Sequence, residues 1–139
     1  MSVEIDIRYQ GDLHCTATHG PSGQTLTTDA PVDNGGKGEA FSPTDLVATA
    51  LGTCLVTTMD LVARKNDLDI SGTHVHVVKE MVSTPVRRIG SLKAIITLPI
   101  DKLLSETDRK KLENAAKLCP VKQSLHSDVD IQVEFKYPD

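Results

Sequence analysis

A long helix that starts near Ser42 is the strongest constraint on what this chain can fold into. Ser42 suits an N-cap, Pro43 suits the first helical position, and Asp45 lies three residues after the cap. Apolar and small residues then recur at intervals of three and four up to about Asn66. We expect the core-facing side of this helix to carry Val47, Ala50, Leu51, Cys54, Thr58, Leu61 and Val62.

Segments of alternating apolar and polar residues flank this helix and predict β-strands. The first three segments are separated by turn residues and predict an antiparallel meander, and the next two predict a hairpin. The predicted strands cover residues 3–9, 13–18, 24–28, 69–81, 88–100 and 129–135. Together with the helices, they predict an α+β fold.

A second helix should open at Ser105 and be interrupted by Pro120. Its apolar face should carry Leu112, Ala115, Ala116 and Cys119. Because proline suits a first helical turn but breaks a helix interior, Cys119 should lie at the junction with a short helix over residues 121–125. Unpaired N–H groups at a helix start favour a thiolate, so Cys119 is a candidate redox residue; the alternative is a small buried residue before a kink.

The size and composition of the chain limit its class. A length of 139 residues predicts a single domain over residues 1–139. The net charge of −4, the absence of Trp and the two Phe and two Tyr residues predict no nucleic-acid partner. The sequence begins without a secretory pattern and suggests no membrane-spanning segment, so we expect a cytoplasmic protein with no membrane partner. In that reducing compartment the three cysteines should be free or catalytic.

Two segments resemble the signatures of the OsmC/Ohr superfamily. Residues 42–54, Ser-Pro-Thr-Asp-Leu-Val-Ala-Thr-Ala-Leu-Gly-Thr-Cys, resemble the helix that ends its small-residue run in the first reactive cysteine. Residues 115–121, Ala-Ala-Lys-Leu-Cys-Pro-Val, resemble the second signature. The resemblance covers essentially the whole chain. It implies an α+β OsmC-like fold of antiparallel sheets and two long central helices, in an intertwined homodimer.

The resemblance also implies thiol-dependent peroxidase chemistry without a cofactor. Cys54 would attack an organic hydroperoxide, Cys119 would resolve the product as a disulfide, and an external dithiol such as a lipoyl protein or thioredoxin would reduce it. Asp45 would hold the activating network, although it also completes a capping box. The hydroperoxide-resistance branch carries Glu at the place of Thr44.

That branch also carries an activating Arg in its N-terminal hairpin. Residues 19–22, His-Gly-Pro-Ser, contain none. Cys54 would then need another cation, for which Arg87, Arg88 and Lys37 are the candidates. The alternative function is a binding or sensing protein that keeps the dimer and an apolar interface pocket without turnover.

The histidines allow two further readings. His74 and His76 share one face of a predicted strand, but no Cys or His follows at a spacing that completes a zinc site, so we expect no metal. Cys119 and His126 could serve as nucleophile and base of a hydrolase. The sequence offers this pair no orienting partner and no oxyanion hole.

Overall fold

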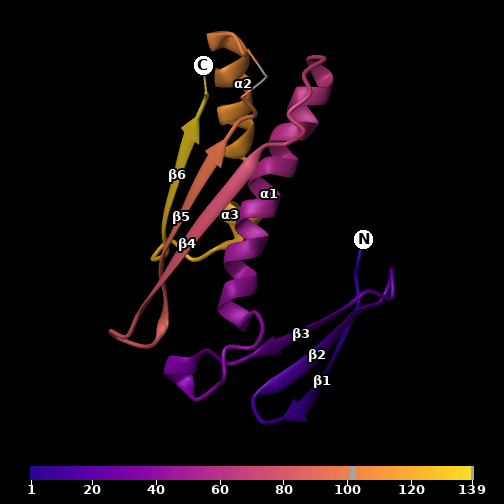
Figure 1. Ribbon diagram of the computed structural model, residues 1–139, viewed down its shortest axis with the longest axis vertical. Helices are drawn as coiled ribbons and strands as arrows, with labels where there is room; N and C mark the ends of the chain where they lie inside the picture. Colours follow the sequence, from indigo (N-terminus) through magenta and orange to yellow (C-terminus); the bar gives the residue numbers. More distant parts are fainter. Residues whose placement is uncertain (101–102, 139) are drawn as a thin grey trace. The chain divides into compact units, whose positions relative to one another are not determined.

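The computed structural model describes residues 1–100 and 103–138 and divides the chain into two compact units (Figure 1). The N-terminal unit comprises residues 1–47 and the C-terminal unit residues 48–139. Each unit contains a three-stranded sheet. The predicted α+β fold is therefore confirmed.

The N-terminal unit is the antiparallel meander that the sequence predicts. Its strands are β1 (Ile5–Gly11), β2 (His14–His19) and β3 (Thr25–Asp29), in that order in the sheet. The β1–β2 turn has three successive residues with positive φ: Gly11, Asp12 and Leu13. A short 3-10 helix, η1 (Val32–Asn34), and a glycine-containing loop follow β3.

The C-terminal unit contains a mixed sheet in the order β4 (His74–Val82), β5 (Arg88–Thr97) and β6 (Asp130–Lys136). The β4–β5 hairpin is antiparallel as predicted, but β6 pairs with β5 in parallel, so the expectation of purely antiparallel sheets is wrong. Strand β4 begins five residues later than predicted, because the Asp69 carboxylate accepts from the Ser71 N–H at 2.9 Å and forms a turn.

Three helices complete the fold. α1 (Pro43–Lys65) passes from the first unit into the second, where α2 (Glu106–Ala116) and α3 (Pro120–Ser124) follow the hairpin (Figure 1). The Ser105 side chain caps α2 by accepting from the Asp108 N–H at 3.1 Å. The four residues predicted for the apolar face of the second helix are all buried.

The buried side of α1 differs from the predicted one. It consists of Ala48, Leu51, Gly52, Leu55, Met59 and Ala63. Leu61, expected in the core, is 63% exposed, and Cys54 is half-buried. This face is buried because the helix lies close to β4 at Gly52, where an added Cβ would lie 2.8 Å from Val77 Cγ2.

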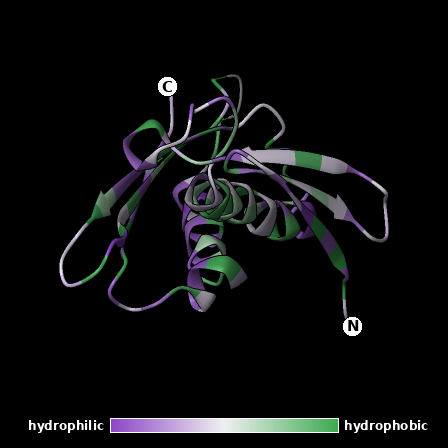
Figure 2. Ribbon diagram, turned by 90° about the horizontal axis from the view of Figure 1, so that it is seen from below, coloured by the Kyte–Doolittle hydropathy of each residue, from purple (hydrophilic) through white to green (hydrophobic). Residues whose placement is uncertain are grey.

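Helix α1 is also long and apolar enough to cross a membrane, by length and composition alone, which the sequence analysis did not anticipate. The core helix of a water-soluble protein meets the same criterion. Within the C-terminal unit, α1 buries its stripe beside β4, and β5 presents Leu92, Ala94 and Ile96 to the same core. Figure 2 shows the apolar positions of these elements in green.

We predict that Gly52→Ala destabilises the protein, although alanine favours a helix by about 1 kcal/mol. The added methyl would meet the stiff, β-branched Val77, and overpacking of this kind costs about 1–3 kcal/mol. Urea unfolding should show a net loss on the order of 1 kcal/mol. In a Val77→Ala background the same change should cost nothing, whereas an equal loss in both backgrounds would contradict the close-packing explanation.

Candidate functional site

Two cysteines from separate segments of the C-terminal unit form the candidate site. Cys54 lies in the middle of α1 and is half-buried. Cys119 is the N-cap residue of α3, where Pro120 begins the new helix, and its exposed fraction is 0%. Both thiols are free. The predicted junction at Cys119 is thus present, and the short helix after it begins one residue earlier than expected.

The two thiols are hydrogen-bonded to each other. The Cys119 thiol donates to the Cys54 sulfur, which also accepts from the backbone N–H of Val121. Thr58 lies one turn further along α1, and its Oγ1 is 3.8 Å from Cys54 Sγ. The Cys54 sulfur therefore faces three donor groups at once.

These contacts separate the acidities of the two thiols. Burial raises the pKa of Cys54, but the donor groups of Val121, Cys119 and Thr58 outweigh it, so the pKa lies below that of an ordinary thiol. Burial and the sulfur of Cys54 both raise the pKa of Cys119, against the opposing N–H groups of Val121 and Lys122. When the pair loses one proton, Cys54 carries the negative charge and Cys119 stays protonated.

This arrangement suits reversible disulfide chemistry. A thiolate is the nucleophilic form of cysteine, and Cys54 is the more accessible member of the pair. A disulfide requires a sulfur–sulfur separation of about 2.05 Å and specific torsion angles. The two thiols are close enough for each to shift the pKa of the other, which brings the partners of such a disulfide together.

The predicted cations lie at different places in the structure. Arg87 is exposed in the β4–β5 turn. Arg88 begins β5, and its Nη1 donates to the carbonyls of Ile89 and Asp128, each at 3.3 Å. Among the described residues, neither arginine is one of the groups that shift the pKa of Cys54. Lys37 belongs to the N-terminal unit, where its Nζ lies 3.4 Å from an Asp12 oxygen.

Asp45 completes the capping box that the sequence predicts. Its Oδ2 accepts from the Ser42 N–H at 2.9 Å, and the Ser42 hydroxyl accepts from the Asp45 N–H at 3.1 Å. This reciprocal pair satisfies two backbone donors at the start of α1. Its participation in an activating network stays a prediction.

The alternative histidine sites find little support. His74 and His76 lie on the exposed side of β4 with stacked rings 6.5 Å apart. Among the described residues, the group of side chains close enough to share a metal ion lies elsewhere and does not include them. His126 Nδ1 accepts from the Asp128 N–H at 3.0 Å, so its partner is this neighbouring backbone group rather than Cys119.

Two donors to Cys54 were missed by the sequence analysis. Thr58 is four residues after Cys54, a spacing that always places two side chains on one helix face, so this donor could have been found. Val121 could not, because its contribution is a backbone N–H whose direction depends on the path of the chain after Pro120.

A small hollow flanks the α2–α3 junction. It measures about 150 Å³ and is lined by Ala116, Lys117, Lys122, Val133 and Phe135. The Cys119 N–H donates to the Ala116 carbonyl at 3.1 Å, so the hollow adjoins the cysteine segment. Its lining combines apolar side chains with two lysines.

The comparisons with known proteins give one family and one shared fold. The OsmC-like protein family model matches residues 36–134. A structure from Psychrobacter arcticus, provisionally described as an osmotic stress induced and detoxification response protein, is 43% identical; the match covers 94% of this chain and 93% of that one, with a TM-score of 0.88. No curated protein sequence matches the chain.

More distant structures share the fold. The organic hydroperoxide resistance protein OsmC from Legionella pneumophila is 14% identical, with 98% of this chain and 97% of that chain covered and a TM-score of 0.78. The organic hydroperoxide resistance protein OhrB of Bacillus subtilis is 19% identical, with 98% of both chains covered and a TM-score of 0.70.

We predict that Cys54 alkylates as a thiolate at a pH where ordinary cysteines are still mostly protonated. In a Cys15→Ser background, the rate of iodoacetamide reaction should rise with pH to a plateau, with a midpoint below that of the same chain unfolded in urea. Adding Cys119→Ala removes one donor and should move the midpoint of the folded protein upward. A folded midpoint at or above the unfolded one with Cys119 present would contradict the donor arrangement.

Proposed function

Because the chain belongs to the OsmC-like protein family, we propose that it is a thiol-dependent peroxidase that reduces organic hydroperoxides. Cys54 is the attacking residue and Cys119 the resolving residue in this proposal. The observation that supports it best is the hydrogen bond from the Cys119 thiol to the Cys54 sulfur, which gives the two cysteines unequal acidities. In this proposal Cys54, as the more acidic thiol, is suited to attack the peroxide, and Cys119 stays protonated until the second step.

The proposed reaction proceeds in three balanced steps. The Cys54 thiolate attacks the distal oxygen of the hydroperoxide, the S–O bond forms as the O–O bond breaks, and the leaving alkoxide takes a proton from solvent to become the alcohol. The Cys119 thiol then displaces water from the Cys54 sulfenic acid and forms the disulfide. An external dithiol, of the lipoyl or thioredoxin kind, returns two electrons and two protons.

Two observations favour an organic hydroperoxide as the substrate. The core around the cysteine pair is aliphatic, and the chain contains no Trp. Several structures that share the fold are described as organic hydroperoxide resistance proteins. We further propose a cytoplasmic, stress-protective role, because a disulfide formed in each turnover needs a reducing compartment to reopen it.

Asp45, Arg87 and Arg88 keep supporting roles in the proposal. Asp45 anchors the start of the helix that carries Cys54. The arginines are candidates to bind the peroxide or the thiolate when the substrate is present, since hydrogen bonds at catalytic sites often tighten only in the complex.

A binding or sensing protein without turnover is the second candidate. The observation in its favour is that the described groups that lower the pKa of Cys54 are neutral donors and include no guanidinium. Neutral donors can stabilise a thiolate, yet a cation would also stabilise the charge that develops on the leaving oxygen. Under this alternative the pair would oxidise slowly, and an apolar pocket at a dimer interface would bind the ligand.

The test is intact-mass analysis, under denaturing conditions, of reduced protein treated with one equivalent of cumene hydroperoxide. The wild type should lose two hydrogens rapidly as the disulfide forms. Cys119→Ser should accumulate the mass of a sulfenic acid on Cys54, and Cys54→Ser should not react. Cys15→Ser is the matched control and should behave as the wild type. A wild type that stays reduced for minutes, while a known thiol peroxidase reacts, would favour the binding protein.

We also propose that residues 1–139 act as one OsmC-like domain within an intertwined homodimer. Strand β1 supports an interface because it exposes apolar side chains on one face: Ile5, Ile7 and Tyr9 are 58%, 65% and 66% exposed. Leu26, across the sheet from Ile7 through Ala17, continues this face. Monomeric proteins rarely expose a contiguous apolar area of this kind without a partner.

Sedimentation equilibrium should therefore give twice the 15.0 kDa of one chain. Ile7→Lys should weaken the dimer because it places a charge in the apolar face, whereas Arg8→Glu, on the opposite side of β1, should leave it intact. A monomer at micromolar concentration, or equal effects of both changes, would contradict this interface.

A further inference from the structure

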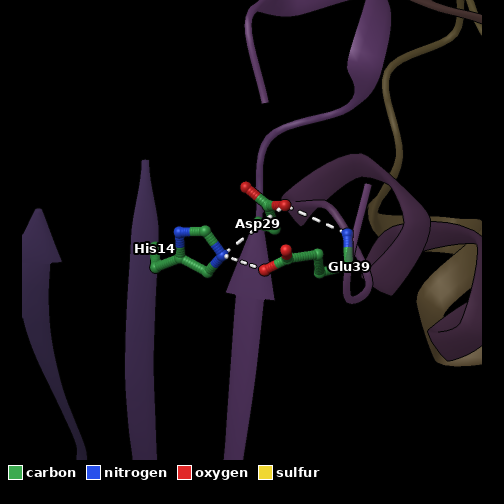
Figure 3. A group of neighbouring side chains, drawn as sticks. All are labelled: His14, Asp29 and Glu39. Carbon is green, nitrogen blue, oxygen red and sulfur yellow. Dashed lines mark hydrogen bonds and ion pairs between the residues drawn. The ribbon is translucent and has the colours of Figure 1, made fainter. Parts of the chain in front are cut away.

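We propose that His14, Asp29 and Glu39 form a binding site for a divalent transition-metal ion, with zinc as the best match. All three residues belong to the N-terminal unit and lie apart from the cysteine pair in the sequence. Their ligand atoms all lie within 4.8 Å of one another (Figure 3). The proposal is independent of the peroxidase function.

The imidazole of His14 is oriented as a metal ligand would be. Its Nδ1 lies 2.6 Å from the Asp12 carbonyl, which can only accept, so Nδ1 carries a proton. Nε2 then faces Glu39 Oε2 at 3.2 Å and Asp29 Oδ2 at 3.5 Å. A bare Nε2 lone pair opposite two carboxylates would be repulsive, so a cation must lie between them: either a proton on Nε2 or a metal ion.

Asp29 provides the second, independent observation. Its side chain is fully buried, and its Oδ2 accepts from the N–H groups of Lys37 at 3.1 Å and Glu39 at 3.0 Å. The other oxygen, Oδ1, has no hydrogen-bond partner. The N–H of Glu39 lowers the pKa of this carboxyl most, with smaller contributions from His14 and from the N–H groups of Lys37 and Ala30, against the effect of burial. A buried carboxylate with one oxygen lacking a partner is costly, and a cation bound by this carboxylate would offset the cost.

The backbone holds these three residues together. His14 and Asp29 are directly paired across β2 and β3, which fixes two of the three ligands. The loop after β3 delivers Glu39, and a Cβ at Gly36 in this loop would collide with the Ala30 carbonyl. Lys37, the nearest cation in the loop, extends toward Asp12 instead, with 3.4 Å between Nζ and the carboxylate. The backbone therefore holds His14 and Asp29 opposite each other before any ion binds, and the loop brings Glu39 to them.

The ligand set favours zinc over the harder cations. One imidazole with two carboxylates suits a transition metal, whereas magnesium and calcium prefer oxygen ligands alone. Ligand atoms at the usual zinc distances of about 2.0–2.2 Å lie roughly 3.3 Å apart in a tetrahedron. The two Nε2–oxygen distances, 3.2 and 3.5 Å, match this spacing. Water would complete the coordination.

The experiment measures zinc binding by equilibrium dialysis against zinc chloride near pH 7.5. It uses the tag-free full chain with Cys15, Cys54 and Cys119 all replaced by serine, because thiolates would otherwise bind the ion. One ion per chain is expected. His14→Gln and Glu39→Gln should each weaken binding by about tenfold or more. Zinc should also raise the thermal unfolding midpoint of the parent protein but not of these two variants.

His126→Gln is the matched control, because His126 lies near the Asp128 carboxylate but belongs to no group of three ligands among the described residues, and this variant should bind zinc as the parent does. Glu39→Gln should keep the protein folded, since the Glu39 side chain is mostly exposed and the hydrogen bond from the backbone N–H of residue 39 to Asp29 is retained. A loss of zinc binding in this variant is therefore a loss of a ligand and not of the fold. Circular dichroism checks both variants. No bound zinc in the thiol-free chain, or undiminished binding in folded Glu39→Gln, would overturn the proposal and leave His14 as a protonated ion-pair partner.

Discussion

The candidate site depends on the unpaired backbone N–H groups at the start of α3. Pro120 ends the preceding helical segment and has no N–H of its own, so the first available donors belong to Val121 and Lys122. The N–H of Val121 lowers the pKa of both thiols, and the N–H of Lys122 lowers that of Cys119. These fixed donors stabilise one negative charge on the pair, and the charge on Cys54 then opposes ionisation of Cys119. The different acidities of the two cysteines follow from this sharing.

The position of Cys54 depends in turn on how closely α1 packs on the sheet. Gly52 brings the helix within van der Waals distance of Val75 and Val77, and Leu51 and Leu55 are fully buried on either side of it. Cys54 lies at the edge of this stripe, half-buried, where its sulfur meets the α3 donors. The small residues that precede the cysteine therefore have a packing reason as well as a chemical one.

Local signals in the sequence predicted the local structure well. The capping boxes, the meander, the β4–β5 hairpin and the break at Pro120 all depend on residues close together in the chain. The predicted core face of α1 was rotated from the observed one: Leu61 is exposed and Leu55 is buried, because the close contact of Gly52 with β4 determines which face turns inward. The parallel pairing of β5 with β6 joins segments that are far apart in the chain, so no local sequence pattern predicts it.

In the candidate sites, too, the sequence predicted the local features and missed those that depend on tertiary structure. The cysteine pair was found through its two segments, but the donor from Val121 depends on a backbone direction that the sequence does not encode locally. The carboxylate and imidazole cluster was missed because its members are far apart in the chain. It becomes visible once the meander is placed in register, since that register pairs His14 with Asp29.

Activation by neutral donors has a chemical advantage. Lowering a thiol pKa increases the thiolate fraction, but the intrinsic nucleophilicity of the sulfur falls with the pKa, with a Brønsted coefficient of about 0.4–0.5. The optimum attacking thiol therefore has a pKa near the ambient pH. Hydrogen bonds from Val121, Cys119 and Thr58 offset the burial of Cys54 and lower its pKa without a full counter-charge. A sulfur held in this way gains thiolate population while it keeps much of its reactivity toward an O–O bond.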